Sequence, residues 1–322
     1  MRVILFFTYG NSLLQWKESG LLDREIKLYK RLNQDYGLNF TFVTYGNETD
    51  FGILDELSYI NVLPVYETLK YDKSKFFRFL RSFFIVSKIK HKLEDADILK
   101  TNQLLGSWVA IIAKYVLNKP LIVRTGYDLL TFSKKNKKSK IKIFFYYLLT
   151  KISVHFSDRY IVSSIVDYEY IKHIHYKHYK KLEVIRNWVD ESKVPEFTKR
   201  YTNQIISVGR LEDQKNYKLL IEKFIGSELS IDLYGEGSLK EDLIQYAKKN
   251  KVTLNINYPV PNKELLKTLG KYKIFISTSS FEGSPKAILE AMSCGCVVFA
   301  VKNENVSEII KNKENGFIFE KD

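Results

Sequence analysis

Residues that bind metals or form disulfides are scarce in this sequence. Its only cysteines, Cys294 and Cys296, are separated by a single residue. Two cysteines this close cannot form an unstrained disulfide and match no zinc-binding spacing, so we expect both to be small buried side chains in a reducing compartment. His173, His175 and His178 lie among lysines and tyrosines, which predicts a surface segment rather than a metal site.

Long apolar runs are also missing. No segment has the roughly 18 to 20 apolar residues that a membrane span needs. The N-terminal run Val3–Phe7 is shorter than the hydrophobic part of a signal peptide, so we expect a cytoplasmic protein.

Acidic residues are too few to balance the basic residues of the first 200 positions. This part contains 34 Lys and Arg against 21 Asp and Glu, whereas the remainder contains 17 against 16. This excess predicts a negatively charged partner for the N-terminal part.

Apolar runs rich in β-branched and aromatic residues alternate with helical stretches along the chain. This alternation predicts largely parallel sheets with right-handed crossovers, and 322 residues suffice for two α/β domains. We predict a first domain over 1–190, a polar linker over 191–203 and a second domain over 204–322. The predicted strands are Val3–Phe7, Phe40–Thr44, Ile60–Val65, Ile98–Thr101, Leu121–Val123, Arg159–Ser163, Glu183–Ile185, Ile205–Val208, Ser230–Tyr234, Thr253–Tyr258, Ile274–Ser277 and Cys296–Ala300. The predicted helices include Leu21–Tyr36, Tyr217–Phe224, Leu239–Lys249 and Asn262–Leu269.

The segment Ile274–Ala300 carries the strongest local signal. A buried strand is followed by a loop of small residues, a helix and a second buried strand. We predict Ser284 as the N-cap of this helix and Pro285 as its first residue, whose missing N–H costs nothing there. Gly295 stands where the helix needs a left-handed end. The ligand-facing end of such a unit is the loop before the helix.

Two carboxylates flank this loop. The N–H groups around Ser284–Lys286 can hold an anion at the positive end of the helix. Glu282 precedes them, and Glu290 lies roughly 7 Å further along the helix at ~1.5 Å per residue. This arrangement fits a ligand with a diphosphate in its middle and hydroxylated rings at both ends, which is a nucleotide-sugar.

Residues 282–295, E-G-S-P-K-A-I-L-E-A-M-S-C-G, resemble the E-x7-E signature of retaining glycosyltransferases of family 4. Gly209–Asn216 resembles the G-R-x4-K-N segment of the same family. The resemblance implies the GT-B fold, in which two Rossmann-like domains face each other across a cleft. It also implies transfer of a sugar from a UDP- or GDP-linked donor to an acceptor hydroxyl with retention, in cell-envelope polysaccharide or glycolipid synthesis. No metal and no further cofactor are expected.

The resemblance assigns roles to residues of the second domain. Arg210 and Lys215 would grip the diphosphate, Glu282 would hold hydroxyls of the donor sugar, and Glu290 would hold the ribose. Either cation is also compatible with a solvated loop position. The other residues expected at the donor are Gly20, Gly209, Gly235, Val260, Gly283, Ser284, Pro285 and Lys286.

The first domain supplies weaker candidates for the acceptor side: Gly10, Arg124, Tyr127, Asp128 and Asn187. Many relatives have a histidine where this chain has Gly126-Tyr127-Asp128, so histidine-dependent activation of the acceptor is not expected. Gly20 matches the glycine that lies close to the donor phosphates, and it equally fits an ordinary tight turn.

Two basic segments of the first domain, Lys73–Lys92 and Lys134–Lys151, combine lysines with aromatic and aliphatic residues. Such helices suit an anionic membrane surface. The alternative is that their apolar stripes pack on the domain's own sheet while the lysines are solvated. With the charge asymmetry, we predict peripheral contact with the inner face of the cytoplasmic membrane.

Two other functions remain open. The first is an inverting transferase or a sugar-nucleotide epimerase of the same architecture, for which Asp128 is the available base. The second is a basic nucleic-acid-binding protein, which would need a positive stripe with interleaved aromatics and a recognisable module. The strongest motif lies in the nearly neutral half, which favours the transferase.

Overall fold

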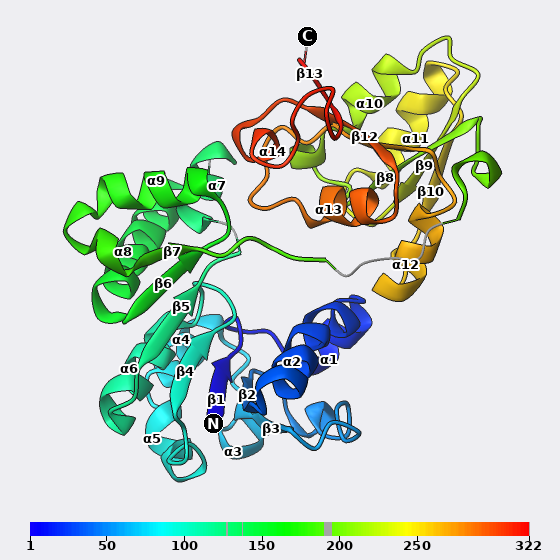
Figure 1. Ribbon diagram of the computed structural model, residues 1–322. Coiled ribbons are helices and arrows are strands. Elements are labelled where there is room, and N and C mark those ends of the chain that lie inside the picture. Colours follow the sequence, from blue (N-terminus) through cyan, green and yellow to red (C-terminus); the bar gives the residue numbers. More distant parts are fainter. Residues whose placement is uncertain (127, 137, 190–194, 322) are drawn as a thin grey trace. The chain divides into compact units, whose positions relative to one another are not determined.

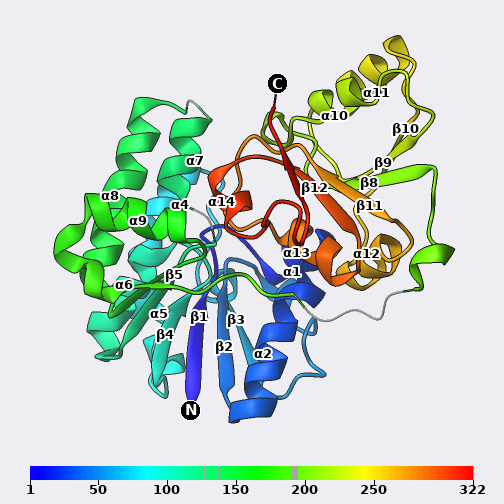
Figure 2. The same cartoon turned by 45° about the horizontal axis from the view of Figure 1, so that its top comes forward.

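The computed structural model describes residues 1–126, 128–136, 138–189 and 195–321. By the contacts within the chain it divides into two compact units, each of which is described by itself (Figures 1 and 2). Unit 1 comprises Met1–Ser163 and Asp167–Ile185, and unit 2 comprises Ser164–Val166 and Arg186–Asp322. The linker predicted over 191–203 lies partly outside the described residues.

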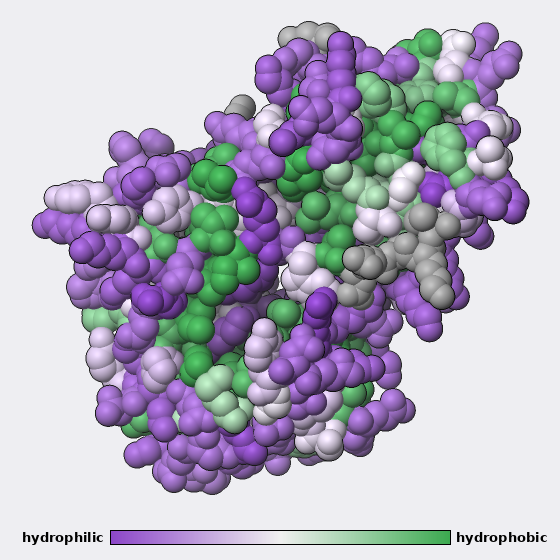
Figure 3. Space-filling model, viewed as in Figure 1, coloured by the Kyte–Doolittle hydropathy of each residue, from purple (hydrophilic) through white to green (hydrophobic). Residues whose placement is uncertain are grey.

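Unit 1 is built on a seven-stranded parallel sheet with the order β3-β2-β1-β4-β5-β6-β7. Its strands are β1 Arg2–Phe6, β2 Asn39–Thr44, β3 Ile60–Pro64, β4 Ile98–Thr101, β5 Leu121–Arg124, β6 Arg159–Val162 and β7 Leu182–Val184. Its helices are α1 Leu13–Glu18, α2 Leu22–Tyr36, α3 Val65–Thr68, α4 Lys75–Ser82, α5 Ile85–Ile89, α6 Ser107–Leu117, α7 Leu129–Lys135, α8 Lys140–Phe156 and α9 Ile165–Ile174. On the face of this unit seen in Figure 3, hydrophobic residues gather over β5–β7.

Unit 2 has a six-stranded parallel sheet with the order β10-β9-β8-β11-β12-β13. Its strands are β8 Gln204–Val208, β9 Ser230–Tyr234, β10 Leu254–Asn257, β11 Ile274–Ser277, β12 Val297–Val301 and β13 Phe317–Phe319. Its helices are α10 Tyr217–Lys223, α11 Lys240–Lys249, α12 Asn262–Leu269, α13 Lys286–Ser293 and α14 Glu304–Ser307. Leu220 and Leu243 bring α10 and α11 into one core layer, whereas Leu269 and Ile288 bring α12 and α13 into the other, so the sheet has helices on both faces (Figure 2).

The predicted strands are confirmed to within one residue at each end. Buried parallel strands have apolar runs with sharp ends, and turn residues bound them, so the sequence locates them well. The loop predicted between Gly10 and Gly20 contains a helix, α1, that was not expected. Ser12 and Gln15 form a capping box at its start, since the Ser12 hydroxyl accepts from Gln15 N and the Gln15 side chain accepts from Ser12 N.

Neither unit contains a membrane span within the residues that the structure describes, because no helix there is both long and apolar enough. Cys294 and Cys296 are buried free thiols, as predicted. Burial raises the pKa of the Cys296 thiol to about 12, so this side chain stays protonated and unreactive at neutral pH.

Candidate active site

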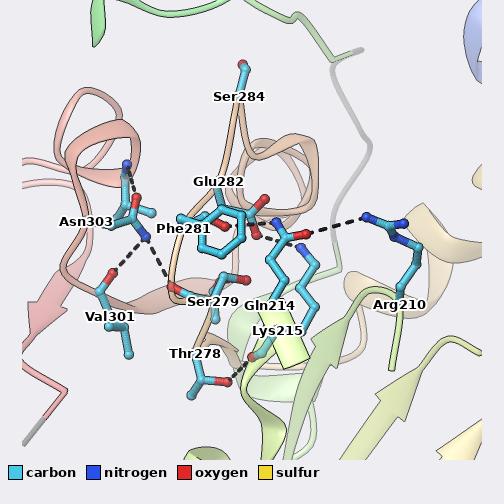
Figure 4. Close-up of polar contacts among 12 residues, drawn as sticks. Arg210, Gln214, Lys215, Thr278, Ser279, Phe281, Glu282, Ser284, Val301 and Asn303 are labelled. Carbon is cyan, nitrogen blue, oxygen red and sulfur yellow. Dashed lines mark hydrogen bonds and ion pairs between the residues drawn. The ribbon is translucent and has the colours of Figure 1, made fainter. Parts of the chain in front are cut away.

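The strand order of the unit 2 sheet reverses between β8 and β11. From β8 it proceeds outward to β9 and β10, and it then returns to place β11 on the other side of β8. In open parallel sheets, ligands bind outside the carboxyl ends of the strands at such a reversal. The loops that follow β8 and β11 contain Arg210, Lys215 and Glu282, so the topology brings the three predicted catalytic residues to this edge (Figure 4).

Lys215 and Glu282 form an ion pair across the two loops. Lys215 Nζ lies 2.6 Å from Glu282 Oε1, and the two side chains are only 17% and 10% exposed. Both charges have thus lost most of their water, and each compensates the other. The sequence assigned these residues to different parts of a donor, and the structure places them in direct contact (Figure 4).

Hydrogen bonds to main-chain carbonyls hold the same two loops together. Ser280 N donates to Gln214 O at 2.9 Å, and Thr278 Oγ1 donates to Lys215 O at 2.8 Å. Gln214 Nε2 also donates to Phe281 O at 2.9 Å (Figure 4). The position of the Lys215–Glu282 pair is therefore fixed by the backbone on both sides.

Arg210 lies at the margin of this network. Its side chain is exposed, and its Nη2 is 3.5 Å from Gln214 Oε1, at the limit of a hydrogen bond (Figure 4). Arg210 can therefore reorient at little cost, whereas Lys215 cannot. Sequence reasoning missed Gln214, which connects Arg210 to the loop after β11, although it stands between the two predicted cations.

The predicted start of the next helix was wrong by one residue. α13 begins at Lys286 with Pro285 as its N-cap, and among the described residues no side chain caps it. Ser284 instead accepts a hydrogen bond at its carbonyl from Asn187 Nδ2, at 3.1 Å. Its side chain points away from the Lys215–Glu282 pair (Figure 4). Pro285 occupies the N-cap position with φ −72° and ψ 86°, so Ser284 lies one residue too early to cap the helix.

Asparagines fix the carbonyls of this loop. Asn305, which is buried, donates from Nδ2 to Gly283 O at 2.5 Å, and Asn303 Nδ2 donates to Ser279 O at 3.2 Å. With Asn187 on Ser284, three asparagines hold three carbonyls of the loop. Asn187 was predicted on the acceptor side, and the structure places it against the loop of unit 2.

Glu290 is a buried carboxylate, only 3% exposed. Its Oε1 accepts a hydrogen bond from Asn262 Nδ2 at 2.8 Å, which ties α13 to the first residue of α12. Glu290 therefore lies on the buried side of the helix. Gly295, after this helix, has φ +70°, which confirms the predicted left-handed end.

Gly209 and Gly235 bring the loops after β8 and β9 into contact. A Cβ on Gly235 would lie 1.9 Å from the carbonyl oxygen of Gly209, and a Cβ on Gly209 would lie 2.8 Å from the Lys215 side chain. Both positions therefore exclude larger residues, because the backbone there approaches its neighbours closely. Val260 is half-buried in the loop between β10 and α12, two strands away from β8.

Comparison with known proteins identifies the fold and supports the superfamily. Residues 189–322 match the family model described as glycosyl transferases group 1. The structure superposes on that of Anabaena Alr3699/HepE in complex with UDP and glucose, with a TM-score of 0.72 and 15% identity over 99% of this chain and 86% of the other. A variant of S. aureus TarM in complex with UDP gives a TM-score of 0.72 and 13% identity over 99% and 90%. The chain has the GT-B fold.

Curated relatives of this GT-B chain are glycosyltransferases. N-acetylgalactosamine-N,N'-diacetylbacillosaminyl-diphospho-undecaprenol 4-alpha-N-acetylgalactosaminyltransferase of Campylobacter jejuni is 28% identical over 150 residues, 44% of this chain and 41% of that protein. UDP-Gal:alpha-D-GlcNAc-diphosphoundecaprenol alpha-1,3-galactosyltransferase of Escherichia coli is 29% identical over 262 residues, 71% of this chain and 64% of that protein. The chain spans less than two thirds of either relative. These matches support the expected glycosyltransferase superfamily, and family 4 remains a prediction.

In the N-terminal unit of this GT-B chain, the corresponding reversal lies between β1 and β4. Gly10 and Gly20 are both in the segment after β1, with φ +84° and +69°. Tyr9 N, in the same segment, donates to Leu105 O at 3.0 Å, which joins the loops that follow β1 and β4. The structure of unit 1 thus places Gly10 directly after the contact at the reversal, whereas Gly20 lies between α1 and α2.

The acceptor-side candidates after β5 have structural partners. Asp128 is buried and caps α7, accepting from Thr131 N at 2.7 Å and from Thr131 Oγ1 at 2.5 Å. Burial raises the pKa of the Asp128 carboxyl. Arg124 ends β5 and is half-buried. Tyr127 lies outside the described residues.

Metal-binding clusters are not found in the described part of the chain, where no three His, Cys, Asp or Glu side chains come together. His155 and His178 form a pair, with 3.1 Å between Nδ1 of the former and Nε2 of the latter. Arg210 and Lys215 are two cationic groups on the loop after β8, and Lys215 is the one that contacts Glu282.

Proposed function

We propose that this chain is a retaining glycosyltransferase that moves a sugar from a UDP- or GDP-linked donor to an acceptor hydroxyl. The observation that carries the proposal is the Lys215–Glu282 ion pair, buried at the reversal point of the unit 2 sheet. It joins a cation suited to a phosphate and a carboxylate suited to sugar hydroxyls in one fixed position. The family-model match covers both residues.

Departure of the nucleotide builds negative charge on the diphosphate and positive character on the sugar. Groups that are already in place at those positions stabilise the transition state most. Lys215, held by Glu282 and by its fixed backbone, takes the leaving phosphate, and the exposed Arg210 adds a second cation when the donor is bound. These two cations serve in place of a metal ion, and no further cofactor is required.

The two carboxylates have separate tasks. Glu282 accepts hydrogen bonds from hydroxyls of the donor sugar, and Glu290, which Asn262 also contacts, accepts them from the ribose. A double-displacement mechanism of the glycosidase type needs two carboxylates facing each other across one bond. Glu282 is paired with a lysine, so we assign it to binding and not to nucleophilic attack.

The relatives indicate a donor and an acceptor class. HepE binds UDP and glucose, and the C. jejuni and E. coli transferases carry an undecaprenol diphosphate acceptor in their names. We therefore propose a UDP-sugar as the donor and a lipid-linked glycan of the cell envelope as the acceptor. The reaction would then take place at the cytoplasmic face of the membrane.

The test is a panel of UDP- and GDP-sugars, with release of nucleotide as the readout. We expect one donor to be hydrolysed slowly and then transferred, with the anomeric configuration kept in the product by proton NMR. Lys215→Ala lowers kcat about 100- to 1,000-fold, as expected when one preorganised positive group is removed. The control is Lys218→Ala, an exposed lysine on α10. Equal activity of Lys215→Ala and the control would show that the assignment is wrong, and no turnover of any donor would contradict the function.

A second pair of variants tests the role of Glu290. Glu290→Ala raises the KM for the donor about tenfold, because the ribose loses its acceptor. Asn262→Ala removes the hydrogen bond between α12 and α13 and leaves the carboxylate in place, so the KM changes less. If both variants raise the KM equally, Glu290 has only a structural role.

A further inference from the structure

Two segments of unit 1 contain no acidic residue. Residues 73–93 and 129–157 each contain seven Lys and Arg and neither Asp nor Glu. Together they account for 14 positive charges, which equals the net charge of the whole chain. The first segment forms α4, α5 and the turn after them, and the second forms α7 and α8.

Helix α4 presents its apolar side to solvent. Ser82 is buried on its inner side, where Trp108 Nε1 donates to Ser82 Oγ at 2.8 Å. On the outer side Phe76 is 65% exposed, and Phe84, just beyond the helix, is 63% exposed. Of the three phenylalanines of α4, Phe79 packs on the core, whereas Phe76 and Phe77 are exposed, so the helix buries a serine while two of its aromatic rings face solvent. The exposed hydrophobic residues of this segment are Phe76, Phe77, Leu80, Phe83 and Phe84.

Helix α8 repeats this arrangement. Ile141 is 82% exposed, Phe144 is 65% exposed, and Leu148 is also exposed. Their spacing of three and four residues places them on one side of the helix. The opposite side packs into the unit through Leu149 and Val154. Packing against the protein's own core therefore accounts for the inner residues of both helices and leaves the outer ones without cover.

The two exposed stripes belong to one surface. The Phe79 ring of α4 contacts the Phe145 ring of α8, with 6.3 Å between their centroids. Phe145 follows Phe144 directly, and Phe79 lies between Phe76 and Phe83 in sequence. Residues 66 positions apart are thus brought side by side, and the exposed Phe76, Phe83 and Phe144 are their neighbours in sequence.

Exposed lysines lie close in sequence to Phe76 and Ile141: Lys73, Lys75, Lys138, Lys140 and Lys142. We propose that the exposed residues of α4 and α8, with Phe83 and Phe84 and these lysines, form a docking face for an anionic lipid bilayer. Aromatic and aliphatic side chains enter the boundary between head groups and acyl chains, and the lysines bind the phosphates. Unit 1 then lies on the membrane without crossing it.

Charge distinguishes the bilayer from a second copy of this chain. Two docking faces brought together would bury phenylalanines but would also oppose two sets of lysines with no acidic residue in either segment. An anionic bilayer satisfies both the apolar and the positive groups. The proposal does not depend on sugar transfer, because lipid binding can be measured without any donor.

The experiment is sedimentation of the full chain with vesicles of phosphatidylcholine, with and without phosphatidylglycerol. We expect binding about tenfold tighter to the anionic vesicles, weakened by high salt. Phe76→Ser/Phe144→Ser weakens this binding about tenfold or more. The matched control is Ile225→Ser/Tyr258→Ser, which removes two exposed hydrophobic residues of unit 2 and keeps the affinity.

Three outcomes would overturn the proposal. The first is that the chain does not bind anionic vesicles at low salt, and the second is that the two double variants bind them equally. The third is that the wild type is a dimer, does not bind lipid, and is separated into monomers by Phe76→Ser/Phe144→Ser. Circular dichroism and thermal unfolding verify that each variant is folded. A Phe84→Trp reporter gives an independent result: its fluorescence shifts to the blue and is quenched by brominated phosphatidylglycerol only if this residue enters the bilayer.

Discussion

The Lys215–Glu282 pair leads to a quantitative prediction for a double-mutant cycle. Glu282→Gln leaves a lysine that is 17% exposed without its counter-charge, and Lys215→Met leaves a carboxylate that is 10% exposed. Loss of one partner from such a buried pair costs about 3 kcal/mol of unfolding free energy. The double variant removes both charges together, so we expect it to cost about the same as one single variant, with a coupling energy of about 2 to 3 kcal/mol.

The cycle is measured by urea unfolding, with hydrogen exchange of the β8 and β11 amides used to follow unit 2 separately. The control cycle is Lys302–Glu320 in the same unit, with 2.8 Å between its charged atoms but side chains 59% and 70% exposed. For this exposed pair we expect a coupling below about 1 kcal/mol. Additive costs at Lys215 and Glu282, or equal couplings in the two cycles, would refute the argument that burial of the pair holds the two loops together.

Three further predictions concern other residues. Asp128→Asn is expected to keep kcat on the best donor within about threefold, because asparagine caps a helix as well as aspartate does. If Asp128 were the base of an inverting enzyme, the same substitution would lower kcat about 100- to 10,000-fold. Burial lowers the pKa of Lys100 from 10.5 to about 7, so between these pH values the folded state binds fewer protons than the unfolded state. Lys100→Met removes this cost. In thermal unfolding it is therefore expected to stabilise unit 1 most near pH 7 and progressively less towards pH 10. Gly235→Ala, whose Cβ would lie 1.9 Å from Gly209 O, is expected to destabilise unit 2 by about 1 to 3 kcal/mol in urea unfolding and to weaken donor binding.

The elements that the sequence predicts best are the buried strands and the residues on the loops after them. β9 and β11 begin and end where the apolar runs do, since a strand covered on both faces tolerates few polar residues. Parallel strands also place their carboxyl ends at one edge, so Lys215 and Glu282 could be predicted to approach each other although 67 residues separate them.

Side chains that bind distant carbonyls could not be predicted in this way. Asn187, Asn303 and Asn305 donate to the carbonyls of Ser284, Ser279 and Gly283, respectively. Such a hydrogen bond has no sequence periodicity, because its partner is determined by the tertiary fold. The same limit explains the wrong N-cap at Ser284, whose carbonyl is held by a residue that lies 97 positions earlier.

The sequence alone also does not predict which way the apolar side of an amphipathic helix faces. The spacing of Phe76, Leu80 and Phe83 predicts an apolar stripe, but an inward and an outward stripe have the same sequence pattern. In α4 the structure decides the question through the buried Ser82 and its hydrogen bond to Trp108, a residue of α6. The charge asymmetry already indicated the outward choice, because an acid-free helix gains most from an anionic surface outside the protein.

The ion pair also bears on how the proposed donor is recognised. While Lys215 is bound to Glu282, the pair carries no net charge, so a bare diphosphate must compete with the carboxylate for the ammonium group. A complete nucleotide-sugar avoids part of this cost, because its hydroxyls donate to Glu282 while its phosphate accepts from Lys215, and the lysine has three donors to share. The exposed Arg210 can make the first contact with the phosphate in either case. If the proposed function holds, selectivity for the intact donor over its nucleotide product therefore follows from the contact between these two side chains.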